Sequence, residues 1–472
     1  MEKSSDQKIY TDILIIGGGV IGAASAYYLS KKGLKVTILE KSGIATGASG
    51  SCDGFLFLQS KKDKDIIYLT KSSLKSFPNL AEELSYDIEY ENCGGLVIFS
   101  ENYRREEVED FYKGQKDLGI KTRIMESDEL HRAEPFISEK IISATYCTDE
   151  GQVNPIALNF GFCKAAKKNG ALVITHQAAA SFEISGCKND TTNLSLYAET
   201  NTTFAADNKV DIENCDNSEG SDNISPNTSA SIDTGDNNDI DKNNKEKPRP
   251  INSNHINKEI KKVTTSSGTE VFAGEVIICA GAYSGEVGKI LGIDIPVKPR
   301  RGSLAVTEAL PRTINHAILD YDYICCKFDE NRETGFTVEQ TKQGNLLIGS
   351  IREFKGFDNS IDTLKVAQIL KRSVEIFGLL SEVSIIRIFS GFRPYTEDFR
   401  PLIGPVDGFS NLWIASGHEG DGVALSCATG RLITGMIEAK ISGKDFINTE
   451  FVGIDINKFL PSRFNLAGKQ IF

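Results

Sequence analysis

Six residues near the start of the chain, GGGVIG at 17–22, have the spacing of the motif GxGxxG. They follow an apolar run, residues 12–16, and precede an Ala-rich stretch that is typical of a helix. In that context Gly17 allows a tight turn and Gly19 allows the backbone to approach a pyrophosphate. Gly22 allows the helix to pack closely on a sheet. The sequence therefore predicts a site for a dinucleotide.

The residues after the glycines indicate which part of a dinucleotide each would bind. Val20 and Ile21 open the predicted helix, whose first N–H groups and partial positive charge favour a phosphate. Glu40, followed by Lys41, ends a second apolar run at the position where an acid hydrogen-bonds the adenosine ribose. Its carboxylate would repel a 2′-phosphate, which disfavours NADP. The motif alone does not separate NAD from FAD, and a glycine-rich turn of an ordinary α/β domain is the alternative.

Three further segments have the small residues that a long bound cofactor requires: ATGASGSCDG at 45–54, CAGAYS at 279–284, and a block at 391–440 that contains GFRP and GHEGDG. Small side chains let the backbone approach a ligand, and N–H groups at the start of a helix can face an anionic oxygen. The residues expected to contact the cofactor are Gly17, Gly19, Val20, Ile21, Gly22, Glu40, Lys41, Thr46, Gly47, Ala48, Ser49, Asp53, Gly54, Ala280, Gly281, Gly391, Gly420, Asp421, Gly422 and Val423.

In this order the segments resemble the D-amino acid oxidase superfamily of FAD-dependent oxidoreductases, and within it the group of glycine oxidase, sarcosine oxidase and D-amino acid dehydrogenase. The phrases DEGQVNP, FTVEQTKQGNLLIGSIREFKGFD and GHEGDGVAL look most like the flavin subunits of opine oxidase, hydrogen cyanide synthase and D-hydroxyproline dehydrogenase. The resemblance extends over nearly the whole chain except residues 188–258. It implies that the cofactor is FAD.

The resemblance also implies a substrate site. Arg393, in GFRP, is expected to hold a substrate carboxylate through two parallel hydrogen bonds, and Pro394 to stiffen the turn that aims it. The alternative for Arg393 is a surface ion pair. His418 would either orient the substrate amine or make a structural hydrogen bond. Tyr321 and Tyr323 would line the pocket or, as the blander alternative, pack in a core.

The implied reaction is oxidation of the CH–N bond of an amino or imino acid (a D-amino acid, glycine or sarcosine, a proline-like acid or an opine). A hydride would pass to flavin N5 and leave an imine or a 2-oxo acid. Two alternatives stay open: a glycerol-3-phosphate dehydrogenase-like flavoenzyme, and a non-catalytic flavin-binding scaffold subunit. The electron acceptor is equally open between O2, redox partner subunits and a quinone. No cysteine or histidine is placed convincingly for covalent attachment of the flavin.

Composition limits the other classes of function. The chain has 472 residues and a formal net charge of −12, which favours two domains and disfavours nucleic acid as a partner. Its ten cysteines form no CxxC motif, so free thiols are expected and a zinc or iron–sulfur site is not. The start, MEKSSDQK, lacks a signal-peptide pattern, and we expect a cytoplasmic protein without a transmembrane segment, peripheral to a membrane only through a partner.

The pattern of apolar residues predicts the elements that position these side chains. Strands are expected at 12–16, 35–40, 93–100, 171–175, 344–354 and 412–415, with two more within 268–284. Helices are expected at 20–32, 65–84 with a break at Pro78, 102–118, 154–169, 362–378 and from Val423. These elements predict an α/β plus α+β fold: a Rossmann-like FAD-binding domain from discontinuous segments and a second, mainly antiparallel substrate domain.

The expected domain boundaries follow the change in pattern along the chain. Residues 1–85, 148–187, 259–290 and 391–445 are assigned to the FAD-binding domain, and residues 86–147 and 291–390 to the substrate domain. Residues 188–258 are rich in Asn, Asp, Ser and Thr and poor in large apolar residues, so we expect a low-complexity, disordered insertion, with a strand at 193–197 as a further option.

Overall fold

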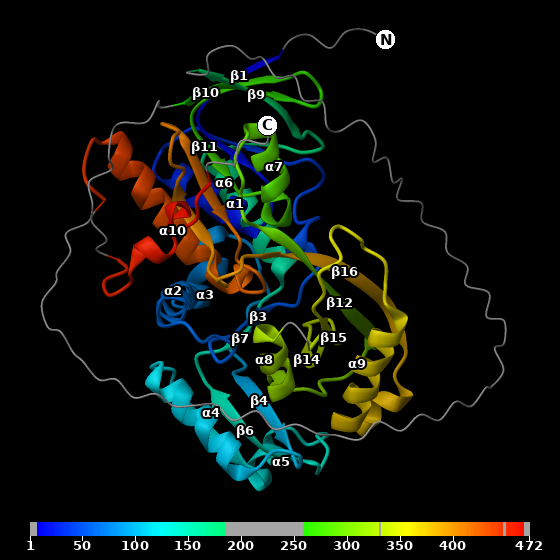
Figure 1. Cartoon of the computed structure of the whole chain (residues 1–472). Helices are drawn as coiled ribbons and strands as arrows, with labels where there is room; N and C mark the ends of the chain where they lie inside the picture. Colours follow the sequence, from blue (N-terminus) through cyan, green and yellow to red (C-terminus); the bar gives the residue numbers. More distant parts are fainter. Residues whose placement is uncertain (1–6, 186–257, 330–331, 447–449, 467–472) are drawn as a thin grey trace, which may run out of the picture. The chain divides into compact units, whose positions relative to one another are not determined.

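The first sheet of the protein arises from short apolar runs that are buried on both faces. The computed structural model describes residues 7–185, 258–329, 332–446 and 450–466 (Figure 1). In strand β1, Lys8–Ile16, the side chains of Ile13 and Ile15 enter one apolar core, and those of Leu14 and Ile16 enter another. A strand with both faces covered is typical of a parallel sheet.

The strands of this sheet lie in the order β17 (Leu402–Pro405), β18 (Leu412–Ser416), β11 (Glu270–Ile278), β1, β2 (Val36–Leu39) and β8 (Leu172–Ile174). Strands β10 (Glu259–Thr265) and β9 (Ala179–Ser185) extend it from β11. The pairs β1–β11, β1–β2, β2–β8 and β11–β18 are parallel. The carboxyl ends of these strands therefore meet at one edge, where ligands of such sheets bind.

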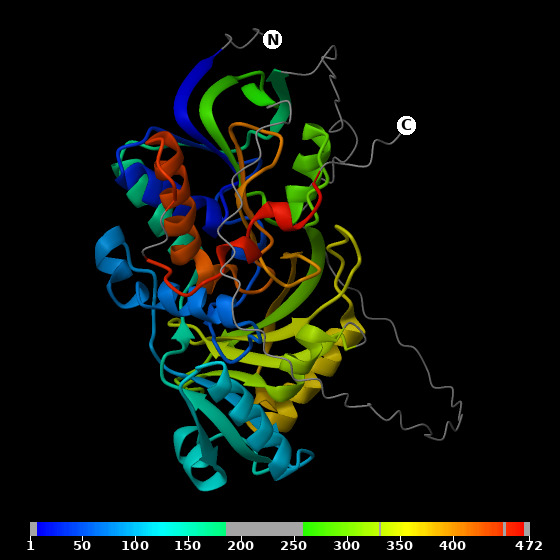
Figure 2. The same cartoon turned by 60° about the vertical axis from the view of Figure 1, so that its left-hand side comes forward.

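Three helices cover one face of the first sheet: α1 (Val20–Lys31), α6 (Pro155–Lys168) and α10 (Gly422–Ile441). Helices α1 and α10 lie side by side in both views (Figures 1 and 2), and a Cβ atom on Gly430 would lie 3.1 Å from the backbone of Ala24. Asn154 caps α6 by accepting hydrogen bonds from the N–H groups of Ile156 and Ala157. Helix α7 (Ser284–Leu291) packs in the core of the opposite face.

The second sheet is almost entirely antiparallel. Its order is β16 (Ile385–Tyr395), β12 (Lys298–Ala309), β15 (Asn345–Ile351), β14 (Thr334–Gln340), β13 (Ala317–Asp320), β4 (Gly95–Ser100), β6 (Ile141–Cys147) and β5 (Thr122–Glu126), and only β13–β4 is parallel. Helix α9 (Thr363–Ile376) packs on one face, where Phe336 and Val338 of β14 meet Val366 and Ile369. Alternate residues of β14, Thr337 and Glu339, therefore point to the other face.

The remaining elements connect or flank the two sheets. They are β3 (Phe55–Leu56), α2 (Lys64–Leu74), α3 (Phe77–Leu84), α4 (Arg105–Asp117), α5 (Ser127–Ala133), β7 (Gly151–Gln152) and α8 (Tyr321–Phe328). The chain passes several times between the first sheet and the second. The expected fold class, a Rossmann-like parallel sheet with a mainly antiparallel partner, is confirmed. The boundaries of the two domains stay predictions. The expected insertion at 188–258, with its optional strand at 193–197, lies outside the described residues except for Lys258.

The predicted break in the helical stretch at 65–84 is present, between the end of α2 at Leu74 and the start of α3 at Phe77, and Pro78 lies in the first turn of α3, where its missing N–H costs nothing. Two other local predictions were wrong. Residues 268–284 contain one strand, β11, followed by a short 3-10 turn at Gly281–Tyr283, rather than two strands. Pro394 lies in β16 instead of a turn, and a proline is tolerated there because β16 is at the edge of its sheet.

Two absences apply to the part of the chain that the structure describes. No helix there is long and apolar enough to cross a membrane. Nor do His, Cys, Asp and Glu side chains gather there in a group that could hold a metal ion. All eight cysteines in the described ranges are free thiols.

Candidate active site

The glycine loop at the end of β1 is built so tightly that side chains do not fit. Gly17 has a φ of +114°, and a Cβ atom there would lie 2.4 Å from the carbonyl oxygen of Cys279, at the end of β11. A Cβ atom on Gly22 would lie 2.1 Å from the carbonyl oxygen of Gly17. The turn, the helix and the neighbouring strand thus approach each other as closely as a pyrophosphate-binding loop requires.

Glu40 is held directly at this loop. Its Oε2 accepts a hydrogen bond from the N–H of Gly18 at 2.7 Å, and its Oε1 accepts one from the N–H of Ser42 at 2.8 Å. Ser49 Oγ accepts a hydrogen bond from the N–H of Val20 at 2.9 Å, which ties the loop before β3 to the start of α1. Val20 therefore uses its N–H within the protein, and the predicted phosphate contacts fall on the other N–H groups of the loop.

The other predicted cofactor segments gather at the same edge of the first sheet. Ala280 and Gly281 follow β11, and the loop before α10 follows β18, which is parallel to β11. Ser416 joins them, because its Oγ accepts a hydrogen bond from Ser284 Oγ at 2.7 Å and donates one to the carbonyl oxygen of Gly281 at 3.1 Å. The N-termini of α1 and α10 thus both begin at this edge.

Small and partly exposed residues line this edge although the strands behind it are fully buried. Of the predicted set, Gly17, Gly19, Glu40, Ala48, Asp53, Ala280, Gly281, Asp421 and Gly422 are partly exposed, and Lys41, Thr46, Gly47 and Gly420 are exposed. Val20, Ile21, Gly22, Ser49, Gly54, Gly391 and Val423 are buried. Small residues beside two helix N-termini suit the length and the negative charge of a dinucleotide. A direct contact of each residue with the cofactor stays a prediction.

Arg393 lies on β16 and crosses the neighbouring strand β12 at a glycine. A Cβ atom on Gly302 would lie 2.1 Å from Arg393 Nη1, so only glycine leaves room for the guanidinium. Nη1 donates a hydrogen bond to the carbonyl oxygen of Ile351 at 2.8 Å, and Nη2 donates one to Ser350 Oγ at 2.6 Å. These contacts fix the direction of a half-buried guanidinium that faces Gly420, at the start of α10.

Two further arginines converge on the same place. Arg300 of β12 is paired with Arg393 across the strands, and it is 1% exposed. Arg352, directly after β15, is 3% exposed and donates hydrogen bonds to Glu419 Oε1 and to the hydroxyl of Tyr323, both at 2.5 Å. Burial and the charges of Arg352 and Arg393 lower the pKa of Arg300, and Glu419 opposes them. Like charges placed opposite one another destabilise a sheet, so the cluster needs an acid such as Glu419 to offset the repulsion.

A single carboxylate, Glu419, is shared by these arginines. It lies 3.6 Å from Arg300 as well as in contact with Arg352. Burial alone would raise the pKa of Glu419, but the charges of the arginines and of Lys327 bring it below its ordinary value. Glu419 is therefore ionised, and the Nε atoms of Arg300 and Arg352 are buried without a hydrogen-bond partner.

Asp421, which begins the last turn before α10, makes a second ionised cluster beside the first. Its Oδ1 lies 3.0 Å from Lys61 Nζ and its Oδ2 lies 2.9 Å from Lys327 Nζ, and both lysines are 4% exposed. Burial would raise the pKa of Asp421, but the two lysines hold it well below its usual range. Five cations thus face two ionised carboxylates around the start of α10, with Asp53 as a third acid beside Arg393 and Arg352, so the cations outnumber the acids.

His418 is buried, and its Nε2 lies 3.0 Å from the hydroxyl oxygen of Thr429 in α10. Burial lowers the pKa of His418 to about 3, so the ring is neutral in the physiological range. This geometry favours the structural hydrogen bond over a part in proton transfer. The catalytic role of His418 stays a prediction without support from its surroundings.

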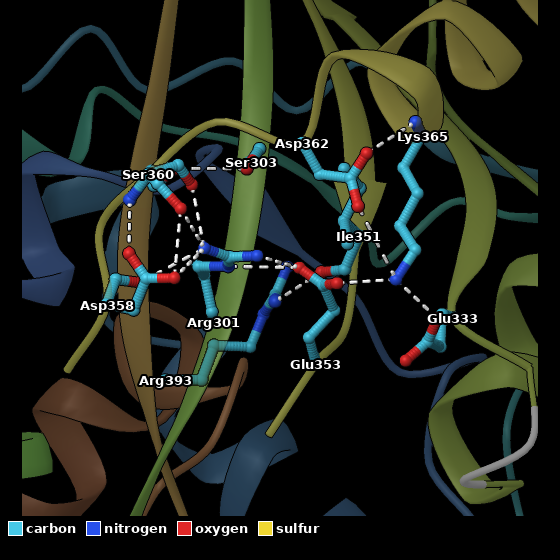
Figure 3. A network of polar contacts seen from close by, with 11 residues as sticks. Arg301, Ser303, Glu333, Ile351, Glu353, Asp358, Ser360, Asp362, Lys365 and Arg393 are labelled. Atoms are coloured by element: carbon cyan, nitrogen blue, oxygen red, sulfur yellow. Dashed lines mark hydrogen bonds and ion pairs between the residues drawn. The ribbon is translucent and has the colours of Figure 1, made fainter. Parts of the chain in front are cut away.

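A network of ion pairs and hydrogen bonds on the opposite face of the second sheet fixes the segment that carries Arg352 (Figure 3). Arg301 donates hydrogen bonds to Glu353 Oε2 from Nε at 3.0 Å and from Nη2 at 2.7 Å. Lys365 of α9 contacts Glu353 Oε1 at 2.5 Å. Because neighbouring residues of an extended chain point to opposite faces, fixing Glu353 on one side directs Arg352 to the other.

A family model described as FAD dependent oxidoreductase (DAO) matches residues 12–215 and 249–436 of the chain. The chain belongs to this family. FAD is therefore its cofactor, and the narrow glycine turn, the acid at the end of β2 and the two helix N-termini fit that group. The protein is an FAD-dependent oxidoreductase of the DAO family.

Relatives in the DAO family match almost the full length. Hydrogen cyanide synthase subunit HcnC of Pseudomonas aeruginosa is 24% identical over 494 residues, with 96% of each chain covered. Glycine oxidase of Geobacillus kaustophilus is 24% identical over 442 residues, covering 92% of this chain and 94% of the relative. The crystal structure of that glycine oxidase has a TM-score of 0.71 at 21% identity, covering 97% of this chain and all of that chain. L-proline dehydrogenase from P. horikoshii has a TM-score of 0.70 at 20% identity, covering 97% and 98%.

Sequence reasoning missed several residues of the site. Arg300, Arg352, Lys61 and Lys327 come from separate elements, and Glu419 lies inside the GHEGDG segment but was not singled out there. One signal was present: PRR at 299–301 and IRE at 351–353 place charges inside or directly after apolar strands, where a charge is buried only with a partner. Tyr323 was considered as a pocket residue, and the structure bonds it to Arg352.

Proposed function

We propose that this oxidoreductase removes a hydride from the carbon next to nitrogen in an amino acid or imino acid and leaves an imine, which hydrolyses to a 2-oxo acid or persists when it is cyclic. The observation that carries the proposal is the positive charge beside the predicted flavin position. Arg300 and Arg352 share one carboxylate there, and the half-buried Arg393 is the most accessible of the three arginines. An anionic substrate group would complete the charge balance.

Each residue of the site has a part in this proposal. Arg393 binds the substrate carboxylate, since a guanidinium offers parallel donors that match two oxygens. Arg300 and Arg352, which are more deeply buried than Arg393, add to the positive potential at the site. Glu419 offsets the repulsion between them. A substrate fixed by its carboxylate reacts faster because its orientation is already set when it binds. When bound, FAD supplies the redox chemistry by accepting the hydride at N5.

The relatives support the class of substrate. Glycine oxidase and L-proline dehydrogenase are named for an amino acid and for an imino acid, and both match the chain over more than nine-tenths of its length. Hydrogen cyanide synthase HcnC is named as a subunit. Partner subunits or a quinone therefore join O2 as candidate electron acceptors. A phosphate ester is a weaker candidate, because glycine oxidase and L-proline dehydrogenase, which match nearly the whole chain, are named for acids with a carboxylate.

The test is anaerobic reduction of the FAD-loaded protein by a panel of D- and L-amino acids, sarcosine, glycine, proline and hydroxyproline isomers, and opines. We expect at least one of these compounds to bleach the visible band of oxidised flavin, and readmitted air then separates an oxidase from a dehydrogenase. A protein that binds FAD but is bleached by no amine or imino acid would contradict the proposal and favour a scaffold role.

A further inference from the structure

A pair of carboxyl groups, Asp53 and Glu339, lies beside Arg393 and has no part in the proposal so far. The chain from Ser51 to Gly54 runs between the edge strand of the second sheet and β14. A Cβ atom on Gly391, two residues before Arg393, would lie 2.6 Å from Ser51 Cβ. At the other end, the N–H of Gly54 donates a hydrogen bond to Glu339 Oε1 at 2.8 Å.

The surroundings of Glu339 are unusual for an ionised acid. Its side chain is 4% exposed, it points away from the apolar core of β14, and its Oε2 is buried without a hydrogen-bond partner. Burial, with the charge of Asp53 added, raises the pKa of Glu339 well above its ordinary value. An unpaired buried carboxylate oxygen is costly, but a protonated carboxyl group can donate to a neighbour and remove that cost.

Asp53 is the accessible member of the pair. It is partly exposed, whereas Glu339 is 4% exposed and accepts its hydrogen bond from the next residue, Gly54. Desolvation by the surrounding protein raises the pKa of Asp53, and the charges of Arg393 and Arg352 act against that rise. Two nearby carboxyl groups cannot both ionise readily, so they hold a proton between them.

We propose that the Asp53–Glu339 pair is the proton acceptor of the reaction: Asp53 takes a proton from the substrate ammonium group, and Glu339 stabilises the protonated pair. The inference rests on the proposed function. The N–H bond of the ammonium breaks, its electron pair stays on nitrogen, and the proton joins an oxygen of Asp53. The neutral amine can then release a hydride from the neighbouring carbon and become an iminium, whereas a nitrogen without a lone pair cannot support that charge.

Other charged groups face the pair and set its affinity for protons. Arg393 and Arg352 lower it from β16 and from the end of β15, and Glu419 in the loop before α10 raises it. Glu91 faces Glu339 from the segment before β4, and Cys52 adjoins Asp53 in the chain. The pair therefore lies between the positive charges of Arg352 and Arg393 and the negative charge of Glu91. These opposing charges keep its affinity for protons intermediate, so that it can take up a proton and release it in each turnover.

The experiment measures the rate of anaerobic flavin reduction from about pH 6 to about pH 10 in wild type, D53N, E339Q and E91Q, with a substrate that reduces the wild-type protein. The glutamine in E339Q keeps an oxygen for the N–H of Gly54 but holds no titrating proton. We expect D53N to lose about 100-fold near neutral pH, E339Q to lose less, and both to approach wild type at high pH, where the substrate amine is already neutral. E91Q should keep the maximal rate and shift the profile only slightly, to lower pH, because Glu91 bonds Gln152 and Arg312 and acts on Glu339 through its charge alone.

A second readout needs neither FAD nor a substrate. Infrared spectra of the cofactor-free proteins are compared at neutral pH. The difference between wild type and E339Q should contain the C=O band of a protonated carboxyl group, and the difference between E91Q and E339Q should contain the same band. A D53N or E339Q profile that is parallel to wild type at every pH, or the absence of that band in wild type, would overturn the proposal. If no amine or imino acid reduces the wild-type flavin, both the proposed function and the proton-acceptor role fail. If one of them does reduce it and the variant profiles stay parallel to wild type, only the proton-acceptor role fails.

Discussion

At the scale of single residues, the site depends on Arg393 and on the glycine beneath it. Gly302 gives the guanidinium room to cross β12, and Ile351 and Ser350 fix its direction. A carboxylate bound there gains hydrogen bonds to a charged donor, which are each worth about 1.5–3 kcal/mol. The contribution of Arg393 to substrate binding is therefore large enough to measure by substitution.

R393A should raise KM for the amino or imino acid about 100-fold, since about 3 kcal/mol of binding energy is lost. R393K should lie between R393A and wild type, because an ammonium keeps the charge but not the planar fork. Both variants should retain FAD. Steady-state kinetics and flavin content check this, with R387A on the exposed part of the same strand as the control. Unchanged kinetics in R393A would remove the arginine from the substrate site.

His418 gives a prediction about stability and pH. Its pKa is about 3 in the folded protein, against 6.5 for an ordinary histidine, so between these values only the unfolded chain binds the proton. Wild type therefore loses stability as the pH falls below 6.5, the pKa of an ordinary histidine. H418Q should lose about 2 kcal/mol less than wild type between about pH 8 and about pH 5. Urea unfolding at the two pH values measures the difference, and equal losses would contradict the neutral buried histidine.

At the scale of elements, the parallel strands bring the cofactor residues together. The loops after β1, β11 and β18 meet because those strands run in the same direction. The second sheet supplies the arginines from two adjacent antiparallel strands and from the end of a third. The network of Arg301, Glu353 and Lys365 then holds the far side of that sheet (Figure 3).

G22A should weaken FAD binding by more than about tenfold, because the added Cβ atom would lie 2.1 Å from the carbonyl oxygen of Gly17. The matched control is G114A, since a Cβ atom on Gly114 of α4 would meet nothing within 4 Å. Alanine there should keep FAD affinity and add up to about 1 kcal/mol of helix stability. Titration of FAD into the cofactor-free variants measures both affinities, and wild-type affinity in G22A would refute the loop geometry.

Most elements could be predicted from the sequence, because apolar runs and helix caps are local signals. The run at 12–16, Glu40 at the end of the second run and the helix that follows Val423 all lie where the pattern indicated. The arginine cluster could not be predicted, because Arg300 and Arg352 meet only through the pairing of β12 with β15, and Glu419 reaches them from the loop before α10. Pro394 misled for the same reason: whether a proline lies in a turn or in an edge strand depends on the sheet.

At the scale of the whole molecule, the predicted FAD contacts come from a few short segments that are far apart in the chain, from Gly17 to Val423. Ligand binding stabilises the folded state by mass action. FAD at 100 times its Kd should add about 2.7 kcal/mol, which for a chain of this length raises Tm by about 3 °C. Thermal unfolding with and without FAD measures the shift. G22A should show a smaller shift at the same FAD concentration, and equal shifts would place the binding elsewhere.

The central claim is that the arginine cluster selects a substrate by its carboxylate. The most direct measurement compares anaerobic flavin reduction by an amino or imino acid that reduces the wild-type protein with reduction by the amine that lacks only its carboxylate. We predict that the acid reduces the flavin at least about 100-fold more efficiently, and that R393A removes most of this preference. An amine that reduces the wild-type flavin as efficiently as its parent acid would contradict the account.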